Sequence, residues 1–233
     1  MNTSRKIAIV VGALYLFVNF VTGPPGLVLE TSILDAPDYL TNVSANETRW
    51  IMSGLLLSLM AVGIAGIGLV IYPILKQHNE SIALGYLGFR IIESVFCSVI
   101  VISPLSLIAL SQEYLKAGAS DASYFQTVGT LSIAERASVA GLLIPVFLSL
   151  GALLFYYLLY QSKLLPRFIS VWGLIGVALI LTLNLLSLSL EVGISIGLIF
   201  ALPIISNEIF LGIWLIVKGF NSSAIASGSA KWK

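Results

Sequence analysis

The chain has 233 residues, of which 58% are hydrophobic and 10% are charged, with a net charge of +1. Soluble domains carry about a quarter charged residues, so this composition excludes a protein that folds in water and makes the bilayer its solvent. The nearly neutral charge balance predicts no nucleic-acid partner. One cysteine, Cys97, excludes an intrachain disulfide, and one histidine, His78, excludes a zinc site built on a histidine pair. No cofactor or metal is predicted.

Six apolar stretches follow one another along the chain, each long enough to cross a bilayer. We predict spanning helices over residues 7–28, 50–75, 82–111, 131–161, 168–190 and 193–217. The sequence Gly-Pro-Pro-Gly at 23–26 should end or bend the first helix, because proline lacks a backbone N–H. The acidic segment 30–49 and the polar segment 112–130 are expected to be loops. The predicted fold is all-α, a single six-helix transmembrane domain over 1–220, followed by a polar tail, 221–233, that we expect to be disordered.

Lysine and arginine residues are distributed unevenly between the two sides of this predicted bundle. The poorer side has Arg49 and Lys116, with Arg136 near its surface. The richer side collects Arg5, Lys6, Lys76, Lys163, Arg167, Lys218, Lys231 and Lys233. Short cytoplasmic loops are enriched in these residue types. We therefore predict a multi-pass protein of the cell (cytoplasmic) membrane with both its N-terminus and its C-terminus in the cytoplasm.

The third predicted span carries a polar stripe inside an apolar helix. Tyr86, Arg90, Glu93, Ser94 and Cys97 recur at steps of three and four residues, so they share one face of the helix. A charged side chain in the hydrocarbon costs about 2.5–3.5 kcal/mol on insertion scales. Arg90 and Glu93 are therefore the leading candidates for a functional site.

The sixth predicted span carries a charge at a matching depth. At a rise of about 1.5 Å per residue, Glu208 lies about 15 Å from the basic end of its span, and Arg90 and Glu93 lie about 12 and 17 Å from the basic end of theirs. Glu208 shares its face with small residues, which is typical of a tightly packed helix interface: Gly193, Gly197, Ala201 and Gly212. We predict one buried cluster of Arg90, Glu93 and Glu208, with Tyr86 and Asn207 as hydrogen-bond partners.

The charge of this cluster leaves three functions open. One arginine and two carboxylates sum to −1 if all ionise, so neutrality requires a proton on a glutamate, a bound cation, or compensating water and dipoles. A transporter or proton-coupled permease would give the cluster a water-accessible cavity, whereas a structural, regulatory or assembly protein would keep it dry and fully paired. An intramembrane enzyme would use carboxylate acid–base chemistry on a lipid-like substrate. The predicted partners are the lipid bilayer and a small-molecule, ion or lipid ligand.

Secondary candidates lie nearer the ends of the spans. Trp214 and Lys218 lie at the basic end of the sixth span, where an aromatic belt is expected. Asn184 is a single amide in the fifth span, where it can bridge two helices. Glu135 and Arg136 are expected at the outer interface, where charged side chains are easily tolerated.

Three stretches resemble one known family. They are Gly88-Phe-Arg-Ile-Ile-Glu-Ser94, Leu165-Pro-Arg-Phe-Ile-Ser-Val-Trp-Gly-Leu-Ile-Gly176 and Asn207-Glu-Ile-Phe-Leu-Gly-Ile-Trp-Leu-Ile-Val-Lys-Gly-Phe220. With them the chain, from Arg5 to Phe220, is similar to the bacterial membrane-protein family known as domain of unknown function 4386. The resemblance implies a six-helix integral membrane protein and carries no activity. It places Arg90, Glu93, Asn207, Glu208, Trp214 and Lys218 in the resembling motifs.

Overall fold

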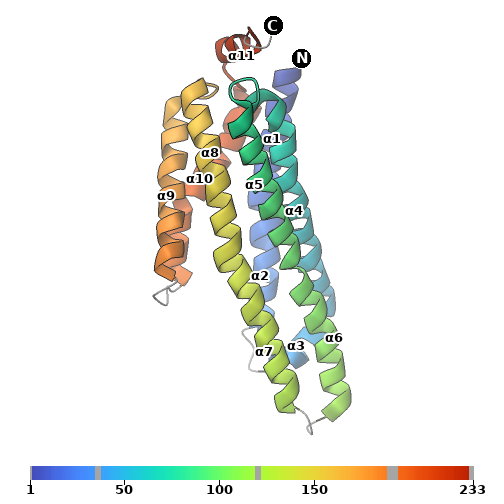
Figure 1. Cartoon of the computed structure of the whole chain (residues 1–233). Helices are drawn as coiled ribbons and strands as arrows, with labels where there is room; N and C mark the ends of the chain where they lie inside the picture. Colours follow the sequence, from blue (N-terminus) through green and yellow to red (C-terminus); the bar gives the residue numbers. More distant parts are fainter. Residues whose placement is uncertain (1, 35–37, 119–121, 188–193, 231–233) are drawn as a thin grey trace.

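The structure is a computed structural model that describes residues 2–34, 38–118, 122–187 and 194–230. In these ranges six helical segments are long and apolar enough to cross a membrane, which confirms the predicted all-α, six-span fold (Figure 1). They cover Thr3–Thr22, Glu47–Leu75, Glu80–Ala117, Ser123–Ser162, Arg167–Ser187 and Ile199–Val217. The chain is thus a multi-pass membrane protein.

Three of these six spans are built from more than one helical element. In chain order the elements are α1 (Thr3–Leu16), the π-helix η1 (Phe17–Thr22), α2 (Gly23–Leu34), α3 (Tyr39–Ala45), α4 (Glu47–Leu75), α5 (Glu80–Val99), α6 (Ile102–Ala117), α7 (Ala122–Ser138), the π-helix η3 (Val139–Leu143), α8 (Ile144–Ser162), α9 (Arg167–Ser187), α10 (Ile194–Val217) and α11 (Ser222–Ala230).

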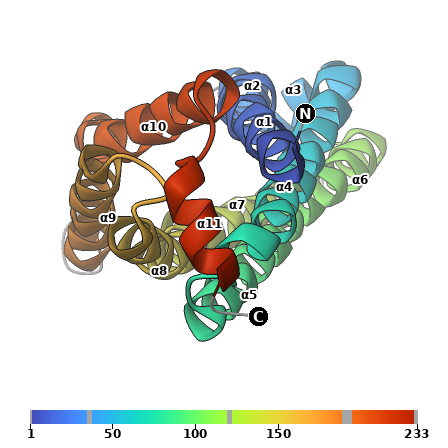
Figure 2. The ribbon, with the colours of Figure 1, turned by 90° about the horizontal axis from the view of Figure 1, so that it is seen from above.

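The six spans form a closed ring when they are seen along the bundle (Figure 2). Neighbours pack in the order α1, α4, α5, α8, α9 and α10, and α10 then packs against α1. In this order α5 lies opposite α10. The interior is filled by a large cluster of buried side chains that includes Tyr15, Tyr86, Phe155 and Tyr156. A side chain of α5 that reaches α10 therefore crosses the middle of the ring.

Two of the spans are almost twice as long as a bilayer requires. The α5–α6 segment has 38 residues and the α7–α8 segment has 40, which at the helical rise correspond to about 57 and 60 Å. The hydrocarbon core is about 30 Å thick. The α6 and α7 ends extend beyond the ends of α9 and α10 (Figure 1). A second apolar core stabilises this extension: Ile33, Leu40, Val43, Trp50 and Leu107.

This extension corrects the prediction of two loops. The segment 30–49 contains the end of α2, all of α3 and the start of α4, and the segment 112–130 is mostly the ends of α6 and α7. The side chain of Trp50 donates a hydrogen bond to the Pro104 carbonyl (Nε1–O 2.8 Å). Apolar burial against neighbouring helices thus outweighs the local polarity from which the loops were predicted.

The Gly-Pro-Pro-Gly sequence does not end the first helix, which was one of the two outcomes expected. Helix α1 continues through η1 directly into α2, where Pro24 and Pro25 lie in the first turn. The N–H of Gly23 donates to the carbonyl of Val18, five residues earlier, as in a π-helix. The wider π turn accommodates the interruption of the hydrogen-bond ladder at this place.

The tail was expected to be disordered, but Ser222–Ala230 forms helix α11. The Asn221 N–H donates to the carbonyl of Leu164 (2.9 Å), and the Asn221 side chain accepts from the N–H of Ser223 (3.2 Å). Ala224 and Ile225 pack against the main core. The composition of the segment, which is mostly small and polar, did not predict that these two apolar side chains would pack against the bundle.

Candidate functional site

Helix α5 carries Arg90, the central residue of the site, and has a side-chain cap at its N-terminus. The Asn79 side chain caps it by accepting from the N–H of Ile82 (3.0 Å), and Glu80 complements the positive end of the helix dipole. Gly68 of α4 allows close approach, because a Cβ there would lie 3.1 Å from Arg90 Cβ. The polar stripe predicted for this span faces inward, as Tyr86, Arg90, Glu93 and Cys97 are all buried.

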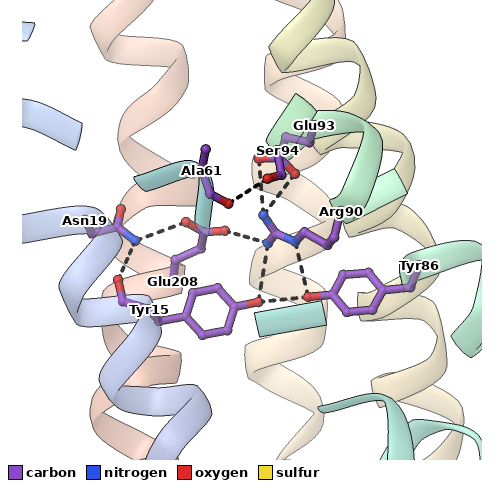
Figure 3. A network of polar contacts seen from close by, with 8 residues as sticks. All are labelled: Tyr15, Asn19, Ala61, Tyr86, Arg90, Glu93, Ser94 and Glu208. Carbon is purple, nitrogen blue, oxygen red and sulfur yellow. Dashed lines mark hydrogen bonds and ion pairs between the residues drawn. The ribbon is translucent and has the colours of Figure 1, made fainter. Parts of the chain in front are cut away.

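The guanidinium of Arg90 makes five hydrogen-bond contacts inside the bundle, through all three of its nitrogens (Figure 3). Its Nε donates to the hydroxyl of Tyr86 (3.2 Å), and its Nη1 donates to Oε1 (3.2 Å) and Oε2 (3.1 Å) of Glu93. Its Nη2 donates to Oε1 of Glu208 (3.3 Å) and to the hydroxyl of Tyr15 (3.5 Å). The predicted cluster of Arg90, Glu93 and Glu208 is confirmed as a spatial arrangement.

The cluster joins three helices across the ring. Arg90 and Glu93 belong to α5, Glu208 to α10, and Tyr15 to α1. Asn19, in η1, donates through Nδ2 to Oε2 of Glu208 (3.2 Å) and to the backbone carbonyl of Tyr15 (3.0 Å). Since α5 and α10 lie opposite one another, the ion pair between Arg90 and Glu208 bridges the two walls of the ring (Figure 3).

The charged groups differ in how deeply they are buried. Arg90 is 4% exposed and Glu93 is 1% exposed, whereas the side chain of Glu208 is 13% exposed. Four pockets among the described residues, with volumes of about 230 to 580 Å³, are lined by none of these three side chains. The three charged groups are thus mostly buried and paired with one another, which is the arrangement expected of a dry cluster.

Two members of the network were not assigned to it from the sequence: Tyr15 was not singled out, and Asn19 was expected only as an amide that could bridge helices nearer the outer half. The hydroxyl oxygens of Tyr15 and Tyr86 are 3.4 Å apart. The ring of Tyr86 stacks on that of Phe155, with ring centroids 4.7 Å apart. The available signal was the four-residue step from Tyr15 to Asn19, which places two polar groups on one face of an apolar span. Their depth relative to Arg90 was not apparent.

Other predicted candidates lie away from the cluster. Asn207 does not contact it, because its Nδ2 donates to the carbonyl of Ile169 in α9 (2.9 Å). The Nδ2 of Asn184 donates to the carbonyl of Ile180 within α9 (3.0 Å). Trp214 packs on Phe168 and Phe210 and, together with Lys218, lines a pocket at the end of the bundle. Among the described residues no group of His, Cys, Asp and Glu side chains could hold a metal ion.

The close helix contact predicted through the small residues of the sixth span is found at Gly212 and not at Gly197. A Cβ added to Gly197 would meet no atom within 4 Å, so Gly197 does not mediate a tight contact. A Cβ on Gly212 would lie 3.0 Å from the carbonyl oxygen of Gly12. Helices α1 and α10 therefore approach at Gly12 and Gly212. Gly193 lies outside the described residues.

A second buried ion pair was not predicted. Arg136 of α7 pairs with Glu30 of α2, which is 1% exposed, and Glu30 also accepts a hydrogen bond from the hydroxyl of Ser53 (2.5 Å). The Nε of Arg136 donates to the carbonyl of Ile100 (3.3 Å). Glu30 was expected in a loop and Arg136 near a surface, and no local spacing connects the two residues.

Comparisons with known proteins identify one family. No curated protein matches the chain, and no solved structure matches it. The sequence model of the family described as "Domain of unknown function (DUF4386)" matches residues 10–219, which include all of the residues of the Arg90 cluster. The protein, a multi-pass helical membrane protein with a buried ion pair between opposite helices, therefore belongs to the DUF4386 family.

Proposed function

We propose that the protein is a small proton-coupled permease of the bacterial cell membrane, in which the Arg90 cluster binds the proton. One observation carries this proposal: a single arginine is shared by two carboxylates, the buried Glu93 at 3.1 Å and the partly buried Glu208 at 3.3 Å. Since arginine stays protonated, the cluster is neutral only when one glutamate holds a proton. Intramembrane ionisable groups are characteristic of proton relays in transporters.

Glu208 is the carboxylate assigned to bind the proton. Its side chain is 13% exposed, against 2% for that of Glu93, so it is the less deeply buried of the two carboxylates. It also belongs to α10, on the opposite side of the ring from Arg90. Protonation of Glu208 removes its charge and weakens the link between the two walls, whereas deprotonation restores the link. A proton is thereby coupled to closure of the ring, and the closed arrangement corresponds to the paired state.

The test compares Glu208→Gln with a matched surface change, Glu113→Gln, which removes a carboxylate paired with Lys116 outside the cluster. Each variant is reconstituted into vesicles that contain a pH-sensitive dye, and a membrane potential is imposed. Infrared spectroscopy of the purified protein follows the carbonyl band of protonated carboxyl groups. We expect Glu208→Gln to abolish both the proton flux and a titrating buried carboxyl band, with an unchanged elution volume on size exclusion. Wild-type flux in this variant would contradict the proposal.

The second candidate function is a structural, regulatory or assembly protein, in which the cluster only pairs helices. The observation that favours it is that the charges of the cluster are paired, and that none of the four pockets described above is lined by a cluster residue. This function predicts that Glu208→Gln lowers the stability of the bundle but that neither wild type nor variant carries protons. The two measurements above therefore separate the two functions.

The orientation in the membrane is part of the same proposal. The two termini and the turns α4–α5 and α8–α9 lie at one end of the bundle (Figure 1), and this end carries Lys76, Lys163 and Arg167. The enrichment of basic residues in cytoplasmic loops supports a cytoplasmic location for this end. In a Cys97→Ala background, an impermeant thiol reagent added to intact cells should label Asp38→Cys but not Asn79→Cys. The reverse pattern would invert the orientation.

A further inference from the structure

We propose that a pocket at the basic end of the bundle binds a phosphate-bearing anion, as the headgroup of an anionic lipid or as a free phosphate ester. The pocket has a volume of about 550 Å³ and lies between the α8–α9 turn and the α10–α11 turn. Lys163, Arg167 and Lys218 line it together with Trp214 and Phe220. This site is separate from the Arg90 cluster, and the inference does not depend on the proposed proton coupling.

Within the described part of the chain, the charges at this pocket have no acidic counterpart. No carboxylate of the described residues forms an ion pair with Lys163, Arg167 or Lys218. Helix α9 begins at Arg167, so the unsatisfied N–H groups and the positive dipole end of a 21-residue helix add to the positive field. The α10 C-terminus contributes little opposing charge, because Arg5 donates to the carbonyls of Leu215 (3.1 Å) and Ile216 (2.5 Å). The pocket is therefore suited to an anion.

The backbone of Lys163 is an independent indication. Lys163 ends α8 in the left-handed conformation, with φ 56° and ψ 26°, and it is the one non-glycine residue at positive φ among the described residues. Glycine is the residue usually found at such a C-terminal turn, because a Cβ is sterically disfavoured there. A lysine at this position is thus unfavourable for the backbone, and its side-chain charge at the pocket supplies a reason for it.

The walls of the pocket are held together before any ligand binds. The backbone N–H of Asn221 donates to the carbonyl of Leu164 (2.9 Å), which joins the two turns. Gly219 turns the chain after α10 with φ +74°. Helix α11 then crosses the end of the ring (Figure 2). Preorganised walls reduce the entropy lost on binding.

The ligand chemistry follows from the mixture of groups. Lysine ammonium groups and the arginine guanidinium are the side chains that bind phosphate, and basic pockets between transmembrane helices bind anionic lipid headgroups. Trp214, Phe220 and Leu165 provide apolar surface beside the cations, and tryptophan is enriched at the level of the headgroups. A lipid phosphate can contact the cations while its glycerol and first methylenes contact these apolar side chains.

The test measures binding of short-chain phosphatidylglycerol to the purified protein in neutral detergent by native mass spectrometry. Glycerol 3-phosphate and phosphatidylcholine are titrated in parallel. The decisive variant is Lys163→Gly, since glycine suits the left-handed turn and removes the charge. Lys76→Gln is the control, because it removes a cation at the same end of the bundle but outside the pocket.

We expect Lys163→Gly to bind phosphatidylglycerol about fivefold more weakly than wild type, while its melting temperature is equal or higher. Lys163→Gly, Arg167→Gln and Lys218→Gln together should weaken binding on the order of 100-fold. Lys76→Gln should bind as wild type does. Binding of glycerol 3-phosphate with the same dependence on Lys163, but not of the lipid, would assign the site to a soluble phosphate ester. Unchanged binding in the triple variant, or an equal loss in Lys76→Gln, would overturn the proposal.

Discussion

The charge balance of the Arg90 cluster predicts a marked asymmetry between its members. Arg90→Met keeps most of the aliphatic stem but leaves Glu93 and Glu208 buried without a cation, whereas Glu208→Gln leaves a neutral pair of Arg90 and Glu93. Removing one partner so that charge stays buried and uncompensated costs about 3–5 kcal/mol. Glu208→Gln keeps the hydrogen-bonding groups and removes only their charge. Hydrogen bonds between membrane helices contribute about 0.6–1.7 kcal/mol, so the loss should be no larger than this. We therefore expect Arg90→Met to be the more destabilising change by about 2–3 kcal/mol.

A combined variant tests the cause of this asymmetry. Arg90→Met together with Glu93→Gln and Glu208→Gln removes all three charges and keeps similar volumes. If uncompensated charge is the cause, the combined variant should be more stable than Arg90→Met alone, with a coupling energy of about 1–3 kcal/mol.

The measurement is the free energy of unfolding in mixed micelles, obtained from the folded fraction as the mole fraction of a denaturing detergent rises. The matched control is Glu113→Gln, which changes an exposed ion pair and should alter stability by less than about 1 kcal/mol. Two results would refute the reasoning. One is an Arg90→Met variant no less stable than Glu208→Gln, which would mean that the carboxylates reach water without the arginine. The other is a combined variant no more stable than Arg90→Met.

Two further predictions concern packing and the second ion pair. Gly212→Leu should reduce the yield of monodisperse protein in detergent, because the new side chain would meet the backbone of α1. Gly197→Leu is the control and should be tolerated, because its position has open space. Equal yields of the two variants would contradict the α1–α10 contact. Arg136→Ala should lower the free energy of unfolding by about 3–5 kcal/mol by leaving Glu30 buried and unpaired, and addition of Glu30→Gln should restore part of this loss. Additive losses in that cycle would show that Glu30 and Arg136 do not interact.

Local periodicity predicted the part of the site that lies on a single helix. Residues three and four apart share a face, so Tyr86, Arg90 and Glu93 were grouped correctly. Counting depth from the basic ends of two spans also brought Glu208 to the level of Arg90. The same reasoning failed for Asn207, because adjacent residues on a helix point in directions about 100° apart. Glu208 faces the cluster, whereas Asn207 contacts the backbone of α9.

The tertiary structure decided which helices are neighbours and how each is rotated. In a bilayer the lipid-facing side of a helix is as apolar as its packed side, so composition does not distinguish the two. For this reason Gly197 and Gly212 looked equivalent in sequence, although only Gly212 contacts another backbone. The ion pair of Glu30 and Arg136 could not be predicted for the same reason. It forms between α2 and α7, which are distant in the sequence but meet in the fold.

The sequence by itself determined the solvent of the protein, the number of spans and the presence of costly charges inside them. These properties depend on composition and on repeats within one helix, which act over a few residues. Only the tertiary structure decided that Tyr15 and Asn19 complete the Arg90 network, and that Arg90 reaches Glu208 across the ring. A buried charge must find a partner wherever packing brings one, and that partner is set by long-range contacts rather than by spacing along the chain.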